Sequence, residues 1–229
     1  MVNLNDVTNV HFIGIAGAGM RAIANVFIEK GYHVSGSDLK ASPVTEQFAK
    51  CGARICIGQS PENLQDAQVV VISSAIRDNN VELVEARRRQ IPVIHRSDAL
   101  VHIMSWGKGI SVAGAHGKTT TSSMLGQVFE ECRQDPTIVI GGEVDYLHSN
   151  SILGKGQYVI AEADESDGTF LKQHPYIAVV TNIDADHMDH YNSLENVIAA
   201  FKEFIQKLDP EKGLAVLCFE NDKRSEERL

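Results

Sequence analysis

A glycine-containing loop in the middle of the chain restricts the possible folds more than any other feature. Residues 114–121 read GAHGKTTT, and the apolar run at 110–113 before them predicts a buried strand. The loop, its Gly-Lys-Thr and a following helix together indicate a phosphate-binding loop in an α/β domain. The helix is predicted from one apolar face, which consists of Met124, Leu125, Val128 and Phe129.

The chemistry of this loop suits an anion. Glycines let backbone N–H groups turn toward a phosphate, and a helix N-terminus adds unpaired donors and a partial positive charge. Lys118 can reach the outer phosphates, and the hydroxyl of Thr119 or Thr120 can ligate magnesium. The standard spacing has a further glycine at the position of Val112, so a plain helix cap is the alternative.

Another glycine loop, which is the first in chain order, lies near the start of the chain. Residues 10–15 predict a strand, and residues 14–20 read GIAGAGM before a helix that ends at Gly31. A strand at 33–38 ends in Asp38, about 20 residues past the glycines, where a dinucleotide-binding fold has its ribose-binding carboxylate. The alternative is a tight glycine turn that packs a helix on a sheet, with Asp38 as a cap.

The alternation of strands and helices continues and predicts two domains. Residues 1–106 form a Rossmann-like domain with a parallel sheet, residues 106–109 form a linker, and residues 107–229 form a P-loop α/β domain. In the first domain, further strands are expected at 54–57, 68–74 and 92–94, and helices at 45–51, 80–90 and 97–104. In the second, strands are expected at 137–140, 158–161, 177–181 and 214–219, and a helix around 197–205.

Acidic residues follow two strands of the second domain. Residues 162–167 read EADESD, and residues 182–187 read NIDADH. Because parallel strands end at a common edge, both segments and the phosphate loop are expected to face one crevice. Glu162 and Thr119 suit magnesium, and His187 suits a second metal or the phosphate. The alternative for Glu162 is a solvated loop acid.

Composition excludes some classes of function. The net charge is −9, from 30 acidic and 21 basic residues, so nucleic acid is not expected as a partner. The four cysteines show no C-x-x-C spacing and are expected to be buried free thiols in a reducing compartment. No leader and no apolar run of about 18 residues is present, so we expect a cytoplasmic protein.

Six motifs, taken together and in this order, resemble the Mur ligase family of peptidoglycan synthesis. They are residues 14–20, 35–38 (SGSD), 73–76 (SSAI), 114–121, 162–167 and 181–189 (TNIDADHMD). The resemblance covers essentially the whole chain. It implies ATP-dependent amide formation on UDP-N-acetylmuramate, with magnesium, and His116 before Gly-Lys-Thr points to the L-alanine-adding branch or its tripeptide-recycling relative.

The resemblance also implies roles for particular residues. Lys118, Glu162 and His187 would be catalytic, and Thr119, Glu162 and His187 would hold metal. ATP would contact Gly114, Ala115, His116, Gly117, Lys118, Thr119 and Thr120. The UDP-sugar would contact Gly17, Ala18, Gly19, Met20, Ser37, Asp38, Ser73 and Ser74.

The chain departs from the family pattern in two ways. Ala115 stands where the family usually has threonine, which removes one hydroxyl near the phosphates. The family's third domain is not expected within 229 residues, so we expect a fragment that does not complete the reaction alone. Two functions of other classes remain as alternatives, a nicotinamide-dependent oxidoreductase and a nucleotide-binding module without turnover.

Overall fold

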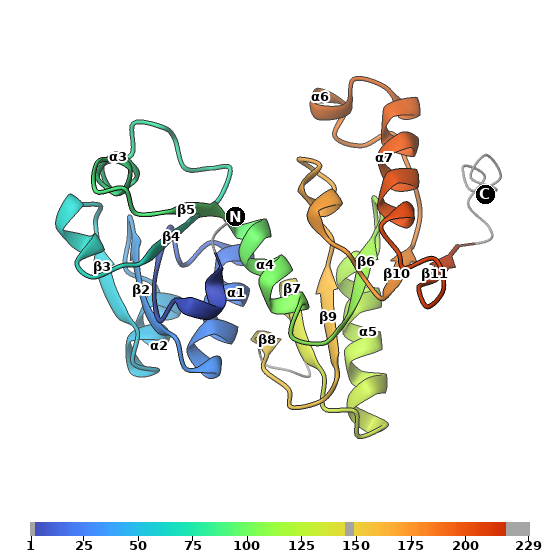
Figure 1. Ribbon diagram of the computed structural model, residues 1–229, viewed down its shortest axis with the longest axis horizontal. Coiled ribbons are helices and arrows are strands. Elements are labelled where there is room, and N and C mark those ends of the chain that lie inside the picture. Colours follow the sequence, from blue (N-terminus) through green and yellow to red (C-terminus); the bar gives the residue numbers. More distant parts are fainter. Residues whose placement is uncertain (1–2, 145–148, 219–229) are drawn as a thin grey trace. The chain divides into compact units, whose positions relative to one another are not determined.

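A computed structural model describes residues 3–144 and 149–218. The chain divides into two compact units (Figure 1). Unit 1 comprises Met1–His102 with Asn150–Leu153, and unit 2 comprises Ile103–Ser149 with Gly154–Leu229. The linker predicted at residues 106–109 is too long, because strand β6 already begins at Lys108 and includes Gly109. They pair in parallel with Tyr158 and Val159.

Unit 1 contains a five-stranded parallel sheet in the order β3-β2-β1-β4-β5. The central strand β1 is apolar, and Val10, Phe12 and Ile13 are buried completely, as expected for a strand covered on both faces. This confirms the predicted α/β class with parallel sheets. The strands are β1 (Asn9–Ile13), β2 (His33–Asp38), β3 (Arg54–Ile57), β4 (Val69–Ile72) and β5 (Val93–His95).

The helices of unit 1 begin and end at residues with recognisable capping chemistry. Ser42 and Thr45 form a capping box at the start of α2, and Asn80 caps α3 through the N–H groups of Glu82 and Leu83. Gly31 ends α1 with φ 97°. The helices are α1 (Ala18–Lys30), α2 (Pro43–Lys50), α3 (Val81–Arg88) and α4 (Arg96–Met104), with 3₁₀ turns η1 (Leu4–Asp6) and η2 (Pro61–Leu64).

A buried polar network joins the sheet of unit 1 to α3. The Glu82 carboxylate is fully buried and accepts hydrogen bonds from Ser37 (2.6 Å) and Asn63 (2.5 Å), and His11 Nε2 lies 3.3 Å away. Burial alone would raise the pKa of Glu82, but the bonds from His11, Ser37 and Asn63 outweigh it, and the pKa lies below its ordinary value. The ionised carboxylate is therefore part of the native packing.

The second sheet has six strands in the order β11-β10-β6-β9-β7-β8, and strands β6, β7, β9, β10 and β11 belong to unit 2. Strand β8 was not predicted from the sequence, since its residues, SNSI, lack an apolar run. Of the predicted strand at 214–219, residues 214–217 form β11 and Phe219 lies outside the described residues. The strands are β6 (Lys108–Ala113), β7 (Thr137–Val144), β8 (Ser149–Ile152), β9 (Tyr158–Glu162), β10 (Ile177–Val180) and β11 (Leu214–Leu217).

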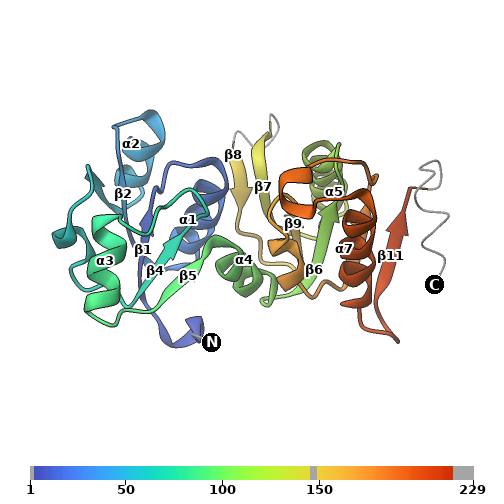
Figure 2. The same cartoon turned by 90° about the horizontal axis from the view of Figure 1, so that it is seen from above.

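Helices α5 and α7 cover opposite faces of this sheet (Figure 2). The predicted apolar face of α5 is only partly buried. Leu125 and Phe129 are partly buried, and Phe129 packs against Tyr158 of β9, whereas Met124 and Val128 are 57% and 56% exposed. The buried positions are Ser122 and Gly126, whose small size allows the helix to approach the strands closely. The helices are α5 (Lys118–Glu131), α6 (Met188–Tyr191) and α7 (Leu194–Gln206), with the 3₁₀ turn η4 (Thr169–Lys172).

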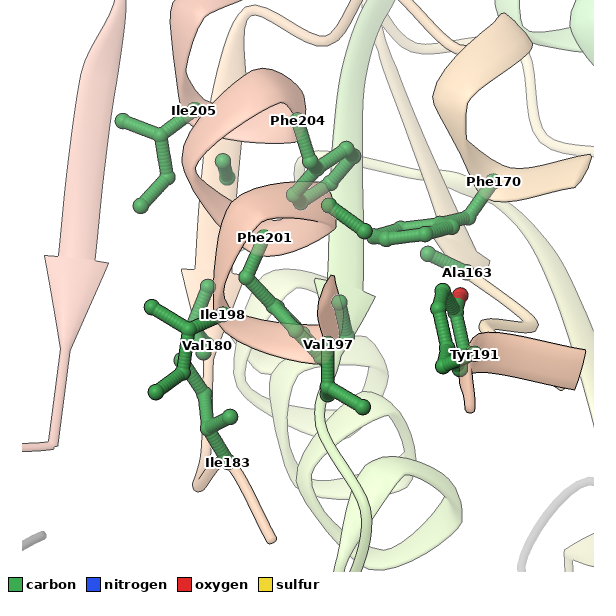
Figure 3. Close-up of a cluster of buried hydrophobic side chains, with 13 residues drawn as sticks. Ala163, Phe170, Val180, Ile183, Tyr191, Val197, Ile198, Phe201, Phe204 and Ile205 are labelled. Carbon is green, nitrogen blue, oxygen red and sulfur yellow. The ribbon is translucent and has the colours of Figure 1, made fainter. Parts of the chain in front are cut away.

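The core between α7 and the sheet also fixes the loop that follows β9. Phe170 packs against Phe201 and Phe204 with ring centroids 5.4 and 5.1 Å apart. Ala163 and Tyr191 belong to the same buried cluster (Figure 3). Burial of each large apolar side chain contributes about 2 kcal/mol. Both ends of the acidic segment that follows β9 are therefore held by the core.

The cysteines differ from the expectation of buried thiols. All four are free, but Cys51 and Cys132 are exposed, and Cys56 and Cys218 are only partly buried. Cys51 and Cys132 are the C-cap residues of α2 and α5, where a side chain faces solvent. Cys56 lies in strand β3. Within residues 3–144 and 149–218, none of the helices combines the length and apolarity needed to cross a membrane.

Candidate functional site

The second glycine loop connects the end of β6 to the start of α5. Gly117 is the N-cap of α5, with φ 84°, and Gly114 has φ 136°. A Cβ atom on Gly114 would lie 2.1 Å from Thr181 Oγ1, so both its backbone conformation and its surroundings require glycine. The loop is thus held in a conformation that leaves the first N–H groups of α5 without a capping side chain.

The segment after β10 holds this loop in place. Asn182 accepts a hydrogen bond from the backbone N–H of His116 at 2.9 Å and donates one to its carbonyl oxygen at 2.8 Å. Thr181 donates a second bond to the same carbonyl at 2.7 Å. Strands β10 and β6 are neighbours, with Val180 paired to Ala113, so both segments leave the same edge of the sheet. The structure therefore brings together the two segments that the sequence predicted to share an edge.

Lys118 is fully engaged by acceptors from the protein. Its Nζ donates to the carbonyl oxygens of Gly114 (2.7 Å) and Ala115 (3.4 Å) and to Glu165 Oε1 (2.7 Å). The side chain of Glu165 is 4% exposed and that of Lys118 is 21% exposed. The P-loop lysine thus forms a largely buried ion pair.

Glu165 also links Lys118 to His187. His187 Nε2 lies 3.7 Å from Glu165 Oε1, and the hydroxyl of Tyr191 donates to the Glu165 carbonyl oxygen at 2.5 Å. Burial raises the pKa of the Glu165 carboxyl, and the Lys118 hydrogen bond opposes that shift. Burial, together with the nearby carboxylates, raises the pKa of Tyr191 to about 12, so its hydroxyl remains a donor.

Glu165 is the site residue that the sequence interpretation did not select. It lies in the acidic segment 162–167, of which only Glu162 was chosen. Its position beyond the strand end, in the same run of acids, is the only signal that the sequence offers. The choice between neighbouring acids depends on the course of the loop after β9, which ends at Glu162.

Glu162 and Thr119 approach a pair of glycines in β7. Glu162 Oε2 accepts the N–H of Gly141 at 2.7 Å, and a Cβ on Gly142 would lie 3.0 Å from Thr119 Cγ2. Glu162 Oε1 is buried and has no hydrogen-bond partner among the described residues. A hydroxyl and a carboxylate with an unused oxygen are hard ligands that fit magnesium.

The acids that His187 contacts are Glu165 and Asp186. Within residues 3–144 and 149–218, no three His, Cys, Asp or Glu side chains are grouped so as to hold a metal ion. His187 instead lies near Glu165 and Asp186, at 3.7 and 3.8 Å. Of the three residues predicted to bind metal, Thr119 and Glu162 lie against the glycines of β7, and His187 lies beside Glu165 and Asp186.

The first glycine loop, in unit 1, is held by backbone contacts and by Asp38. The N–H groups of Gly14 and Ile15 donate to the Ser37 carbonyl oxygen at 2.9 and 3.0 Å. Asp38 Oδ2 accepts the N–H of Ala16 at 3.0 Å. Gly17 is the N-cap of α1 and offers no capping side chain. Asp38 thus has the capping role that was the alternative to ligand binding, with its carboxylate only partly buried.

The remaining residues predicted to contact the sugar nucleotide differ in accessibility. Ser74 is exposed and Ser73 is partly buried, and both follow the end of β4. Ser37 is fully buried and its hydroxyl is bonded to Glu82, while Met20 is 2% exposed, so these two side chains are structural. Arg96, which was not predicted, lies against the loop, since a Cβ on Gly19 would be 3.1 Å from its Nη1.

Two protein-family models match this chain, and each of them spans one of the two glycine loops. Residues 9–106 match the family described as "Mur ligase family, catalytic domain", and residues 112–228 match "Mur ligase middle domain". The chain belongs to the Mur ligase family. The predicted resemblance is therefore confirmed.

Relatives and solved structures in this family are similar over nearly the whole chain. UDP-N-acetylmuramate–L-alanine ligases of Pelotomaculum thermopropionicum and Geobacter sulfurreducens are both 53% identical, over 95% and 94% of the chain. The chain covers only 47% and 46% of them, so it spans about half the length of these curated relatives.

Two solved structures share the fold of this Mur ligase chain. The UDP-N-acetylmuramate-alanine ligase MurC of Thermotoga maritima has a TM-score of 0.86 at 32% identity, over 96% of this chain and 51% of that one. The UDP-N-acetylmuramate:L-alanyl-gamma-D-glutamyl-meso-diaminopimelate ligase of Neisseria meningitides also has a TM-score of 0.86, at 27% identity, over 96% and 74% of the two chains.

Proposed function

We propose that this chain supplies the UDP-sugar site and the ATP site of an ATP-dependent amide ligase that joins L-alanine to UDP-N-acetylmuramate in peptidoglycan synthesis. The proposal rests on the two glycine loops, which are built differently. The loop before α5 has a lysine, Lys118, and lies near Thr119 and Glu162, whose oxygens suit magnesium, whereas the loop before α1 offers backbone N–H groups. The names of the relatives at 53% identity support this substrate pair.

In unit 1, the diphosphate of UDP-N-acetylmuramate would bind at the N-terminus of α1. Gly17, Ala18 and Gly19 offer backbone N–H groups there, and Arg96 adds a positive charge beside Gly19. Asp38, which orders the loop through Ala16, would lie near the uridine. Ser73 and Ser74 would complete the polar contacts at the end of β4.

In unit 2, the phosphates of ATP would bind over residues 114–120. Backbone N–H groups at the start of α5 and the ammonium group of Lys118 would offset their charge. Thr119 and Glu162 would hold magnesium, which, when bound, neutralises charge on the β- and γ-phosphates. His187 would act from the side of Glu165, as a second metal ligand or a phosphate contact.

The reaction would proceed through an acyl phosphate. The lactyl carboxylate of UDP-N-acetylmuramate attacks the γ-phosphorus of ATP, ADP leaves, and the amine of L-alanine then attacks the acyl carbon and displaces phosphate. The chain's own residues contribute by positioning and by charge neutralisation, and Lys118 acts on the phosphoryl group in transfer.

Two other functions remain as proposals to be separated by experiment. A tripeptide ligase of peptidoglycan recycling would use the same two sites and differ in the amine, and the similarity to the Neisseria ligase favours it as the second candidate. An NAD-dependent oxidoreductase or a nucleotide-binding module would use one loop only and would leave the contacts around Lys118 without a purpose.

Calorimetry separates these candidates. Titration of the 229-residue chain with UDP-N-acetylmuramate, with ATP and magnesium, and with NAD should give heat for the first two ligands and none for NAD. Tight NAD binding without a UDP-sugar signal would end the ligase proposal. In the longer relatives, a phosphate-release assay with L-alanine against L-alanyl-γ-D-glutamyl-meso-diaminopimelate would distinguish the two amines.

A further inference from the structure

The ion pair between Lys118 and Glu165 occupies the lysine that a phosphate needs. A lysine ammonium group has three hydrogen-bond donors and no acceptor. Each donor of Lys118 already faces a protein oxygen, two from the loop carbonyls and one from Glu165. A phosphate oxygen can contact Lys118 only if one of these three bonds is given up.

Glu165 is the acceptor that a phosphate would replace. The carbonyl oxygens of Gly114 and Ala115 belong to the loop that Thr181 and Asn182 hold rigid, so they remain beside Lys118. The Glu165 carboxylate is an anion at the end of a side chain with rotatable bonds. An arriving phosphate is an anion of higher charge, and two anions near one ammonium group repel each other.

The second carboxylate oxygen of Glu165 is consistent with such an exchange. Oε2 is buried and has no hydrogen-bond partner among the described residues, although the side chain is only 4% exposed. A buried carboxylate oxygen without a partner is destabilising, so the present rotamer is held mainly by Lys118. The backbone does not need to move, because Ala163, Phe170 and Tyr191 anchor the segment in the core.

We propose that Glu165 is a positioning residue that holds Lys118 when no nucleotide is bound and that the phosphates of the nucleotide displace it from Lys118. This inference rests on the proposed ATP site. The carboxylate keeps the loop lysine ordered in the empty site and lowers the affinity for phosphate by competing for the ammonium group.

The test compares the affinity of the 229-residue chain for ADP in EDTA, so that no metal contributes. Glu165→Gln keeps the shape and an acceptor for Lys118 but removes the charge, and it should bind ADP about fivefold more tightly or better. Asp164→Asn makes the same charge change one residue away and should leave the affinity within about twofold of the wild-type value.

The outcomes are distinct. If Glu165 has only a structural role, Glu165→Gln should bind ADP more weakly than wild type. Weaker or equal binding would overturn this inference, but the proposed ATP site would still stand. Tighter binding by Asp164→Asn as well would reduce the effect to net charge and overturn it too. If neither the wild-type chain nor Glu165→Gln binds ADP, the proposed ATP site itself fails. Thermal melting of each variant establishes that it is folded.

Discussion

The two glycine loops of this chain are held in place by different kinds of side chain. The loop at the start of α1 contains no basic residue and is ordered by an acid, Asp38, which accepts a backbone N–H within the loop. The loop at the start of α5 contains Lys118 and is ordered by the neutral side chains Thr181 and Asn182. Its acid, Glu165, bonds to the lysine and not to the loop backbone.

This difference indicates what each loop can bind. The first offers backbone N–H groups, with Arg96 beside Gly19, which suits a diphosphate that is held without reacting. The second has a charged side chain that must exchange its partner, which suits a phosphate group that is transferred. Variants that affect one loop and spare the other therefore test the comparison.

The largest expected effect is on the stability of the second loop. In Gly114→Ala, the new Cβ would lie 2.1 Å from Thr181 Oγ1 at φ 136°, and the free energy of unfolding should fall by about 3 kcal/mol. Gly17→Ala is the matched change in the first loop, at φ −59° with the nearest atom at 3.3 Å, and should stay within about 1 kcal/mol. Urea unfolding followed by circular dichroism measures both, and equal losses would contradict the difference between the loops.

Removal of Lys118 should weaken the binding of ADP and not the binding of UDP-N-acetylmuramate. Lys118→Ala is expected to weaken ADP binding about 100-fold, because a charge-assisted contact is lost, and to leave UDP-N-acetylmuramate binding unchanged. Lys212→Ala, an exposed lysine of the same unit, is the control. In the longer relatives, the equivalent change should abolish phosphate release. Unchanged ADP affinity in Lys118→Ala would remove the functional distinction between the loops.

Asp38 provides the corresponding test of the first loop. Asp38→Ala removes the acceptor for the Ala16 N–H, and UDP-N-acetylmuramate binding should weaken about tenfold while ADP binding does not change. Asp38→Asn keeps an oxygen at that position and should recover most of the affinity. If Asp38→Asn is as weak as Asp38→Ala, the carboxylate charge is required, and Asp38 contacts the ligand directly.

The smallest effect is a pH dependence confined to unit 1. Glu82 has a pKa below its ordinary value of 4.5 in the folded chain, so the folded state binds fewer protons than the unfolded state. Its stabilising contribution is complete above pH 4.5 and is lost as the pH falls through the lowered folded pKa. The unfolding free energy of Glu82→Gln should therefore depend less on pH in that range than that of wild type, whereas a parallel dependence would assign the titration to other groups.

The sequence predicted the fold better than the details of the site. The strands β2 and β3 begin and end where predicted, because Gly31 and Gly52 precede them and Asp38 and Gly58 mark their ends. Strand β8 was missed because it is polar. The predicted face of α5 was only partly right, because the fully buried positions of this helix are Ser122 and Gly126. Periodicity detects large apolar side chains and does not detect a helix that packs through small ones.

The site residues show the same limit. The loops and their order follow from local patterns of glycine, lysine and acid, and the structure brings Lys118 and His187 together as expected for one edge of a parallel sheet. Two details depend on packing between distant segments. One is the choice of Glu165 as the partner of Lys118, and the other is the burial of the Ser37 and Met20 side chains. A single sequence contains no local pattern for those contacts.

The most direct test of two separate anion loops is a calorimetric titration of ADP into the 229-residue chain already saturated with UDP-N-acetylmuramate. The account predicts one ADP site and one UDP-sugar site that are occupied together, with Lys118→Ala abolishing only the first heat and Asp38→Ala weakening only the second. Mutually exclusive binding, or one variant that removes both heats, would contradict it.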